Sequence, residues 1–308
     1  MPEALPALLI QSAAAAGLGA ALLALWKVSD PRERLRVWLL ALVLPPVLAP
    51  LFSSAAPFRS GPAFREHLAL FDASRWQDLS IGPVRLDVLV VVAAALAGAV
   101  LFVRDLLPLL ARKDEGGRPA AAGSVHLVRE RVAAFAAHFG YAPPEVVVTS
   151  DDEPYLLCRG ASRSTVVVSE GAVRLLTAGE LDAALAHEVA HAAWGHVRLG
   201  WALMGARALV VWNPVAQILG RTAVLELERA ADDAAIRATG RAEDLATALA
   251  KLAGVTLGKD LPGTARRTPA HGRLERLAGG PGDEFPSLGS LRVSLAGAAV
   301  ALTAFFVV

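Results

Sequence analysis

The sequence predicts a mainly α-helical, multi-pass membrane protein that also carries a water-exposed α+β domain. Its 308 residues are 55% hydrophobic and only 19% charged, whereas soluble globular chains are roughly a quarter charged. Long uncharged stretches alternate with a segment of ordinary polar composition. The net charge of +1 gives no sign of nucleic acid as a partner. The chain is therefore expected to be partly embedded in lipid.

Four apolar runs are candidate membrane helices. A helix of roughly 20 apolar residues can cross the hydrocarbon core of a bilayer. The second run contains three prolines, which a membrane helix tolerates when neighbouring groups satisfy the freed carbonyls. The runs are 5–26, 37–52, 88–103 with a continuation towards Leu110, and 293–308.

Lys and Arg gather at the same side of these runs, and cytoplasmic loops carry an excess of both residues. We therefore expect three transmembrane helices in residues 1–110, with an extracytoplasmic loop at 54–85. A cytoplasmic domain is expected at 111–285 and a C-terminal transmembrane helix at 289–308. This places the chain in the cell membrane, with the lipid bilayer as a partner. The basic residues are Lys27, Arg32, Arg34 and Arg36 after the first run, and Arg104, Arg112, Lys113 and Arg118 after the third.

Residues 111–285 have the patterns of a small α+β domain. The β-branched runs at 145–150 and 164–169 predict a small antiparallel sheet. Residues 177–180 read Thr-Ala-Gly-Glu, the form of a capping box that opens a helix. The single cysteine, Cys158, excludes an intramolecular disulfide framework and is expected to be a small core residue.

The helix that follows contains the motif His187-Glu188-Val-Ala-His191. At about 100° per residue, His191 lies about 40° from His187 on a helical wheel, and Glu188 about 100° from it. Both imidazoles can therefore reach one cation, with Glu188 beside it. A zinc ion held in this way lowers the pKa of its bound water to roughly 7 and polarises a carbonyl, while the glutamate moves the proton. The motif predicts Zn²⁺ as cofactor and Glu188 as catalytic residue.

A second helix at 225–240 is expected to supply the third ligand. Glu228 and Asp232 are four residues apart and share a helix face. Glu228 then completes a catalytic site of two histidines and one glutamate, and Asp232 orients a ligand histidine. Glu226 and Asp233 point away from this face and are expected to be solvated helix charges.

The apolar segment 199–219 resembles a further span. However, His191 and Glu228 must reach one ion, and 36 residues lie between them. One crossing would put them on opposite sides of the bilayer, and two crossings need roughly 40 residues plus a turn. We therefore expect a membrane-associated segment that does not span, with Asn213-Pro214 turning the chain back. The site is then expected at the cytoplasmic membrane face.

These motifs together resemble those of the integral-membrane gluzincins, a group of zinc metallopeptidases. HEVAH, the WNPVAQILGR of 212–221 and ELERAADDAAIRATG follow three apolar runs, and in this order they are most similar to the BlaR/MecR-type signalling peptidases. The resemblance covers roughly residues 1–280. It implies a cytoplasmic α+β zincin-type metallopeptidase domain that cleaves a regulatory protein, such as a transcriptional repressor, at a specific site.

This resemblance has one clear departure. BlaR-type receptors carry a sensor with a Ser-x-x-Lys nucleophile after the last span, and the present sequence contains no Ser-x-x-Lys. The signal is therefore expected to come through a partner sensor protein, the loop at 54–85 or the membrane. The substrate is expected to be a protein or peptide that is cytoplasmic or membrane-tethered, and to add as a strand near residues 155–169.

A second resemblance is to the HtpX and CAAX prenyl protease type, which implies quality-control proteolysis of membrane proteins. His196 matches the extra histidine of H-E-x-x-H-x-x-x-x-H, and residues 268–277 are similar to that family's His-Pro…Arg segment. Gly272 replaces the proline after His271. On a helical wheel His196 lies about 180° from His187, so a helix-end or supporting position is expected. Candidates for contacts with substrate or transition state are His196, Tyr155, His271 and Arg276.

A third hypothesis belongs to another class, a non-catalytic membrane scaffold in which zinc only stabilises the fold. Glu188 argues against this hypothesis, because a structural zinc site needs no general base.

Overall fold

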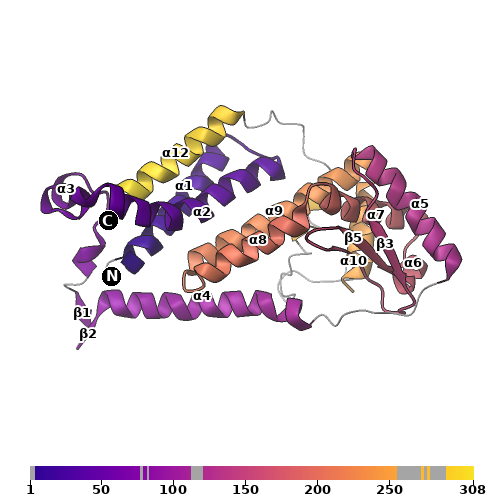
Figure 1. The fold of residues 1–308 in the computed structure, drawn as a ribbon, viewed down its shortest axis with the longest axis horizontal. Coiled ribbons are helices and arrows are strands. Elements are labelled where there is room, and N and C mark those ends of the chain that lie inside the picture. Colours follow the sequence, from indigo (N-terminus) through magenta and orange to yellow (C-terminus); the bar gives the residue numbers. More distant parts are fainter. Residues whose placement is uncertain are drawn as a thin grey trace. The chain divides into compact units, whose positions relative to one another are not determined.

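The computed structural model describes residues 4–76, 79–81, 83–111, 121–254, 272–273, 276–277 and 289–308. Its contacts divide the chain into two compact units, whose elements are labelled in Figure 1. Unit 1 comprises Met1–Ala111, Leu203–Glu226 and Phe285–Val308, and unit 2 comprises Arg112–Ala202 and Leu227–Glu284.

Three long helices of unit 1 coincide with the first three predicted apolar runs. They are α1 (Ala4–Leu25), α2 (Pro31–Ala55) and α4 (Leu86–Ala111), and each is long and apolar enough to cross a membrane by length and composition. Asp30 caps α2 by accepting a hydrogen bond from the Arg32 amide at 2.8 Å. The helix continues through its three internal prolines to Ala55.

The predicted C-terminal helix is α12 (Ser290–Phe306), an apolar helix of 17 residues. It packs against α1 and α2 (Figure 1). The carbonyls at its end have no partner in their own helix, and two distant side chains satisfy them. Arg59 Nε donates to the Phe305 carbonyl at 2.8 Å, and Gln11 Nε2 donates to the Val307 carbonyl at 2.9 Å. The end of α12 is therefore fixed by polar contacts within unit 1.

Short elements fill the predicted loop at 54–85. Phe64 lies between Phe305, in an edge-to-face contact, and Phe306, in a stacked contact. The Leu70 amide donates to the Phe306 carbonyl at 2.8 Å. The loop is thus packed against α12. Its elements are η1 (Pro57–Ser60), α3 (Pro62–His67), η2 (Ala73–Trp76), β1 (Ser80–Ile81) and β2 (Val84–Arg85).

The apolar segment 199–219 is not one continuous helix. It is divided between α8 (His196–Leu209) and α9 (Pro214–Thr239), which run side by side in Figure 1. The chain reverses between Val210 and Asn213, where the Asn213 amide donates to the Val210 carbonyl at 2.9 Å. Residues 203–226 of this helical hairpin belong to unit 1.

Unit 2 contains a three-stranded sheet that corrects our prediction of a simple antiparallel pair. β3 (Glu145–Thr149) and β5 (Thr165–Ser169) are parallel neighbours. The segment between them, in which we predicted no strand, forms β4 (Leu156–Arg159), which pairs antiparallel with β5. The order is β3-β5-β4. β4 occupies one side of β5 in an antiparallel hairpin, and β3 pairs with the other side of β5, where it runs parallel.

Helices α5 and α7 cover the sheet. Val128 of α5, Val166 and Val168 of β5 and Leu185 of α7 share one apolar core and are almost fully buried. The alternating burial of β3 fits a strand with one face on this core. The helices of unit 2 are α5 (Ala122–His138), α6 (Glu170–Leu175), α7 (Ala178–Ala193) and α10 (Ala242–Leu252).

The start of α7 confirms the predicted capping box. Thr177 Oγ1 accepts from the Glu180 amide at 3.3 Å, and the Glu180 carboxylate accepts from the Thr177 amide at 2.9 Å. Lys251 Nζ of α10 donates to the same carboxylate at 2.7 Å. Desolvation alone would raise the pKa of Glu180, but the bonds from Lys251 and Thr177 hold it below its ordinary value. The first turn of α7 is thus tied to α10.

Replacing Thr177 tests the contribution of this box. We expect Thr177→Ala to lower the free energy of unfolding by about 1 kcal/mol, because the Glu180 amide loses the hydroxyl that accepts its hydrogen bond. Thr177→Ser keeps the hydroxyl and is the matched control. Denaturant unfolding of the detergent-solubilised chain, followed by near-ultraviolet circular dichroism, measures the difference. Equal stability of the two variants would contradict the assignment.

Candidate metal centre

His187 and His191 face one point from adjacent turns of α7. Their Nε2 atoms are 3.0 Å apart, and the His187 ring is 8% exposed while the His191 ring is 12% exposed. Helix α7 is buried on several sides, and its residues Leu185 and Val189 lie in the apolar core. This packing fixes the orientation of the helix and therefore the direction of the two imidazoles. Two imidazoles held in this way, out of bulk water, are a suitable pair of ligands for a divalent cation.

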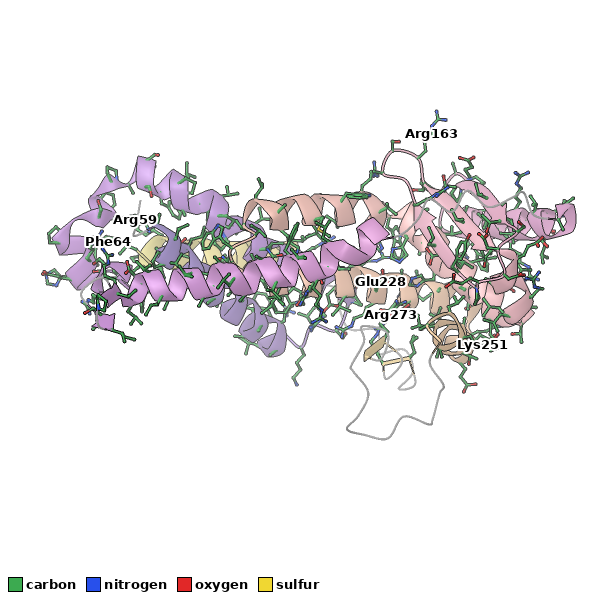
Figure 2. The ribbon with its side chains drawn as sticks, turned by 90° about the horizontal axis from the view of Figure 1, so that it is seen from below. Arg59, Phe64, Arg163, Glu228, Lys251 and Arg273 are labelled. Atoms are coloured by element: carbon green, nitrogen blue, oxygen red, sulfur yellow. The ribbon has the colours of Figure 1, made fainter. Side chains whose placement is uncertain are left out.

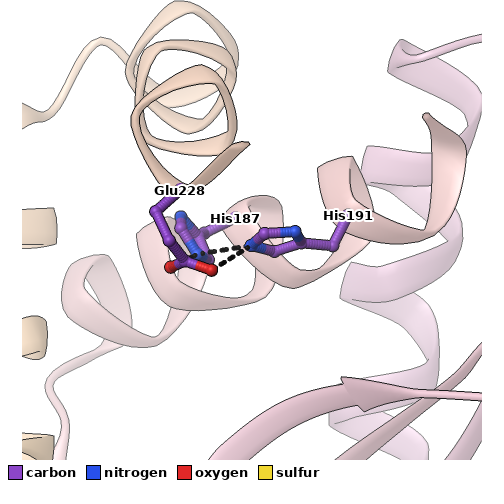
Figure 3. A group of neighbouring side chains, drawn as sticks. All are labelled: His187, His191 and Glu228. Atoms are coloured by element: carbon purple, nitrogen blue, oxygen red, sulfur yellow. Dashed lines mark hydrogen bonds and ion pairs between the residues drawn. The ribbon is translucent and has the colours of Figure 1, made fainter. Parts of the chain in front are cut away.

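Glu228 of α9 completes the group, as Figure 3 shows. Its carboxylate oxygens lie 3.6 Å from His187 Nε2 and 3.5 Å from His191 Nε2. Tetrahedral bonds of 2.0–2.1 Å place ligand atoms about 3.3 Å apart. Because ligand atoms of the three residues lie within 4.8 Å of one another, the predicted set has the size of a zinc site.

Asp232 lies on the other side of the His187 ring. Its Oδ1 is 3.0 Å from His187 Nδ1, and its side chain is completely buried. Burial favours the neutral imidazole, but Asp232 and Glu228 raise the pKa of His187 to about 10. In the metal-free protein this ring therefore carries the proton between two carboxylates. Asp232 has the position expected for a residue that orients a ligand histidine.

Arg273 joins the two carboxylates of α9 and was not among our sequence predictions. It donates from Nη1 to Glu228 Oε2 at 2.7 Å, and from Nε and Nη2 to Asp232 at 2.9 and 2.6 Å. Figure 2 shows Arg273 beside Glu228. A bidentate guanidinium fixes a carboxylate in both position and orientation. Arg273 therefore holds both acidic groups of the centre.

Glu188 lies next to the histidines and is partly buried. Desolvation raises the pKa of its carboxyl to about 7, with a further contribution from the charge of Glu228. The carboxyl also accepts the backbone N–H of Cys158 on β4. Burial raises the pKa of the Cys158 thiol to about 12, so this cysteine stays protonated. Glu188 is thus the group beside the cluster whose proton affinity suits exchange near neutral pH.

His196 is closer to the centre than the helical wheel predicts. Its Nδ1 lies 3.1 Å from Nδ1 of His191, opposite the Nε2 atom that faces the cluster. The wheel assumed a continuous helix, whereas α7 ends at Ala193 and Gly195 has a φ of +65°. This left-handed residue turns the chain back, and glycine adopts it without steric cost. His196 therefore lies just after the end of α7 and contacts the side of the His191 ring that is turned away from the candidate metal site.

The remaining candidates have different surroundings. Tyr155 shares hydrogen bonds with Asp151 and, at 2.7 Å, with Thr149 Oγ1. Arg276 binds the Asp233 carboxylate and donates to the Arg229 carbonyl at 3.1 Å. His271 lies outside the residues that the structure describes. Tyr155 and Arg276 are therefore engaged with groups other than the three ligands.

Two acidic residues contradict the prediction that they are solvated. Glu226 is fully buried and accepts a hydrogen bond from Arg34 Nε at 2.9 Å. Asp233 is 18% exposed and pairs with Arg276. Their helix has protein on several sides, so a residue that points away from the metal ligands still meets a neighbour. Both charges are structural ion pairs.

Residues 119–226 match the model of peptidase family M48. The match supports a zinc metallopeptidase of that family and covers about a third of the chain. It includes His187, Glu188 and His191 and ends just before Glu228, so the third ligand rests on the geometry above. No curated protein and no solved structure matches the chain.

Arg273 can be tested without zinc. Arg273→Gln removes the guanidinium that pairs with both Glu228 and Asp232, and we expect the metal-free chain to lose about 3 kcal/mol of stability. Denaturant unfolding in detergent after chelation measures this loss. Arg276→Gln is the matched control, since Arg276 and Asp233 form a more exposed pair worth about 1 kcal/mol or less. Equal losses would show that Arg273 has no special role.

His196 is expected to support zinc binding through His191. We expect His196→Ala to weaken zinc binding about 10- to 100-fold, the usual cost of removing a residue that orients a ligand. Titration against a competing chelator measures the affinity. His138→Ala is the control, because His138 is exposed at the end of α5. Unchanged zinc affinity in the His196→Ala variant would show that His196 does not support zinc binding.

Proposed function

We propose that the chain is a membrane-embedded, zinc-dependent endopeptidase that hydrolyses peptide bonds at the cytoplasmic membrane face. The observation that carries this proposal is the convergence of His187, His191 and Glu228 within 4.8 Å, with Glu188 beside them. The match to peptidase family M48 supports the same chemistry. A non-catalytic scaffold explains the three ligands but gives no reason for a carboxyl of raised pKa next to them.

His187, His191 and Glu228 would hold the zinc ion, which supplies Lewis acidity for a carbonyl and for water. Asp232, at 3.0 Å from His187 Nδ1, keeps that ring turned with Nε2 towards the other ligands. Arg273 keeps Glu228 in place by its bond to Oε2. These contacts fix the ligand atoms before a substrate arrives, which reduces the reorganisation that the reaction requires.

Glu188 would move the proton. As a carboxylate it takes the proton of the attacking water, and as a carboxylic acid it gives the proton to the leaving amine. Both roles require a carboxyl that exchanges protons near neutral pH, and the pKa of about 7 in the metal-free protein shows that burial favours the protonated form. The Cys158 amide holds the carboxyl beside β4.

Strand β4 offers a place for the substrate backbone. It is an edge of the three-stranded sheet, with β5 on its other side, and helix α7 packs against it. An extended peptide can add to such an edge through main-chain hydrogen bonds. Because Glu188 accepts a hydrogen bond from Cys158 of this strand, the added peptide would run past the catalytic carboxyl.

The cytoplasmic location is supported by the sequence around the apolar helices. α1, α2 and α4 are each long and apolar enough to span, and Lys and Arg gather after α1 and after α4. The positive-inside rule then puts both basic segments, and the metal centre that follows the second one, in the cytoplasm. α12 would form a fourth membrane helix.

The substrate that we propose is a regulatory protein, such as a transcriptional repressor, cleaved at a specific site. The resemblance to BlaR/MecR-type peptidases supports this choice, with the signal supplied by a partner sensor protein. The alternative is a quality-control protease of HtpX type, and the contact of His196 with His191 favours it. Cleavage at one site of one folded protein supports the first function, and cleavage at many sites of unfolded proteins supports the second.

The enzymatic assignment is tested by Glu188→Gln. We expect zinc to stay bound and cleavage of a fluorescence-quenched peptide library to fall at least about 100-fold, because the proton carrier is lost while all three ligands remain. Glu243→Gln, an exposed acidic residue of α10, is the control. Metal analysis and fluorescence release are measured on the same samples. Wild-type cleavage by a zinc-loaded Glu188 variant would refute the peptidase mechanism.

A further inference from the structure

The hairpin formed by residues 203–226 has an unusual distribution of side chains. Every exposed position in this range is apolar or glycine, and Leu209 near the turn is 85% exposed. Ile218 on the second helix is 55% exposed. A surface in contact with water normally carries charged and polar residues. The exposed positions are Gly205, Ala208, Leu209, Ile218 and Val224.

Three polar residues of the hairpin are inside. Arg207, Asn213 and Gln217 are at most 3% exposed. Arg207 Nε donates to Gln217 Oε1 at 3.0 Å across the two helices. Apolar residues outside and polar residues inside reverse the arrangement of a soluble helix pair, as expected where the surrounding medium is hydrocarbon.

The turn of the hairpin satisfies its own backbone. Gln217 Nε2 donates to the Arg207 and Val210 carbonyls at the end of α8, at 3.0 and 3.3 Å. Asn213 Oδ1 accepts from the Val215 and Ala216 amides at the start of α9, at 3.0 and 3.2 Å. Irregular backbone is tolerated at membrane depth only where protein groups satisfy it. Two side chains provide these groups at the turn.

Contacts of the turn with α1 and α4 indicate how deep it would lie in a bilayer. A Cβ atom on Gly98 of α4 would lie 2.3 Å from the Val211 carbonyl oxygen, so the turn packs directly on α4 at this glycine. Asn213 Nδ2 donates to Ser12 Oγ of α1 at 2.9 Å. Gly98 lies near the middle of Leu86–Leu106, and Ser12 near the middle of Ala4–Leu25. Both helices place the turn at their midpoint.

Asp105 of α4 binds both helices of the hairpin at a point further from the turn. Asp105 of α4 accepts hydrogen bonds from Arg207 and from Arg221, the latter at 2.8 Å through Nη2. Asp105 lies about 10 Å further along α4 than Gly98, at about 1.5 Å per residue. The charges of Asp105, Arg207 and Arg221 therefore lie towards the end of α4, where the basic residues follow. The uncharged turn of the hairpin lies nearer the middle of α4.

We infer that residues 203–226 are a re-entrant hairpin, which enters the bilayer from the cytoplasmic side, ends near its middle and returns. Its outer face contacts lipid acyl chains. Lipid is the occupant that fits, because the exposed apolar residues belong to a hairpin whose turn packs at the midpoint of two candidate spans. The inference concerns depth and stands apart from the peptidase activity.

Depth can be measured with single cysteines, because the chain has only one cysteine. In a Cys158→Ala background of the full chain, Leu209→Cys, Ile218→Cys and Arg163→Cys are labelled with bimane and reconstituted in phosphatidylcholine vesicles. Figure 2 shows Arg163 on a loop pointing away from the ribbon, and this variant is the water-exposed control. The quenchers are aqueous iodide and phosphatidylcholine with a doxyl group either near the headgroup or near the acyl-chain end.

We expect doxyl lipid, and not iodide, to reduce the fluorescence at positions 209 and 218, with the chain-end doxyl group more effective at 209 than the headgroup-proximal one. Position 163 should respond to iodide alone.

Iodide quenching at 209 and 218 would put the hairpin in water and overturn the inference. Stronger quenching at 209 by the shallow doxyl group would put the hairpin on the membrane surface. Protection from both quenchers would show a protein partner, such as a second copy of the chain. Each of these outcomes contradicts a lipid-facing hairpin of mid-bilayer depth.

Discussion

The contact between two pairs of side chains on α7 and α9 determines the candidate site. His187 and His191 are one turn apart on α7, and Glu228 and Asp232 are one turn apart on α9. Buried carboxylates are costly unless they are paired, and here a protonated imidazole and the guanidinium of Arg273 compensate them. The metal-free centre is thus already balanced in charge, with its ligand atoms held close together by hydrogen bonds and ion pairs.

Several buried polar groups of unit 1 are also paired. Arg59 and Gln11 satisfy the last carbonyls of α12, Gln217 satisfies those of α8, and Asp105 accepts bonds from two arginines. Each of these contacts provides a partner for a polar group among apolar helices, where an unpaired polar group is costly. These polar contacts link the helices of unit 1 to one another.

Local periodicity was sufficient to predict which side chains meet at the candidate metal centre. The spacing of four residues puts His187 with His191 and Glu228 with Asp232 on common helix faces, and the capping box at Thr177 gives the correct start of α7. The apolar runs likewise predict the three long helices, because length and composition are properties of the chain alone.

Contacts between segments that are far apart in the sequence could not be predicted from it. Arg273 lies 41 residues from Asp232, on a segment with no helical period that would single it out. Glu226 was predicted to be solvated because nothing in the sequence connects it with Arg34, 192 residues away. The wheel misplaced His196 because it extended α7 beyond its end. The parallel pairing of β3 with β5 was missed because we predicted no strand between them.

In the proposed function a substrate peptide adds to β4, and the length of this strand limits how much of that peptide can pair with the sheet. The strand has four residues, Leu156–Arg159, or about 13 Å at about 3.3 Å per residue. Main-chain pairing over this length engages about four residues of a guest chain and is indifferent to their side chains. Selectivity for one protein among many must then arise away from the strand, through tethering of the guest or through the shape of the surface around it.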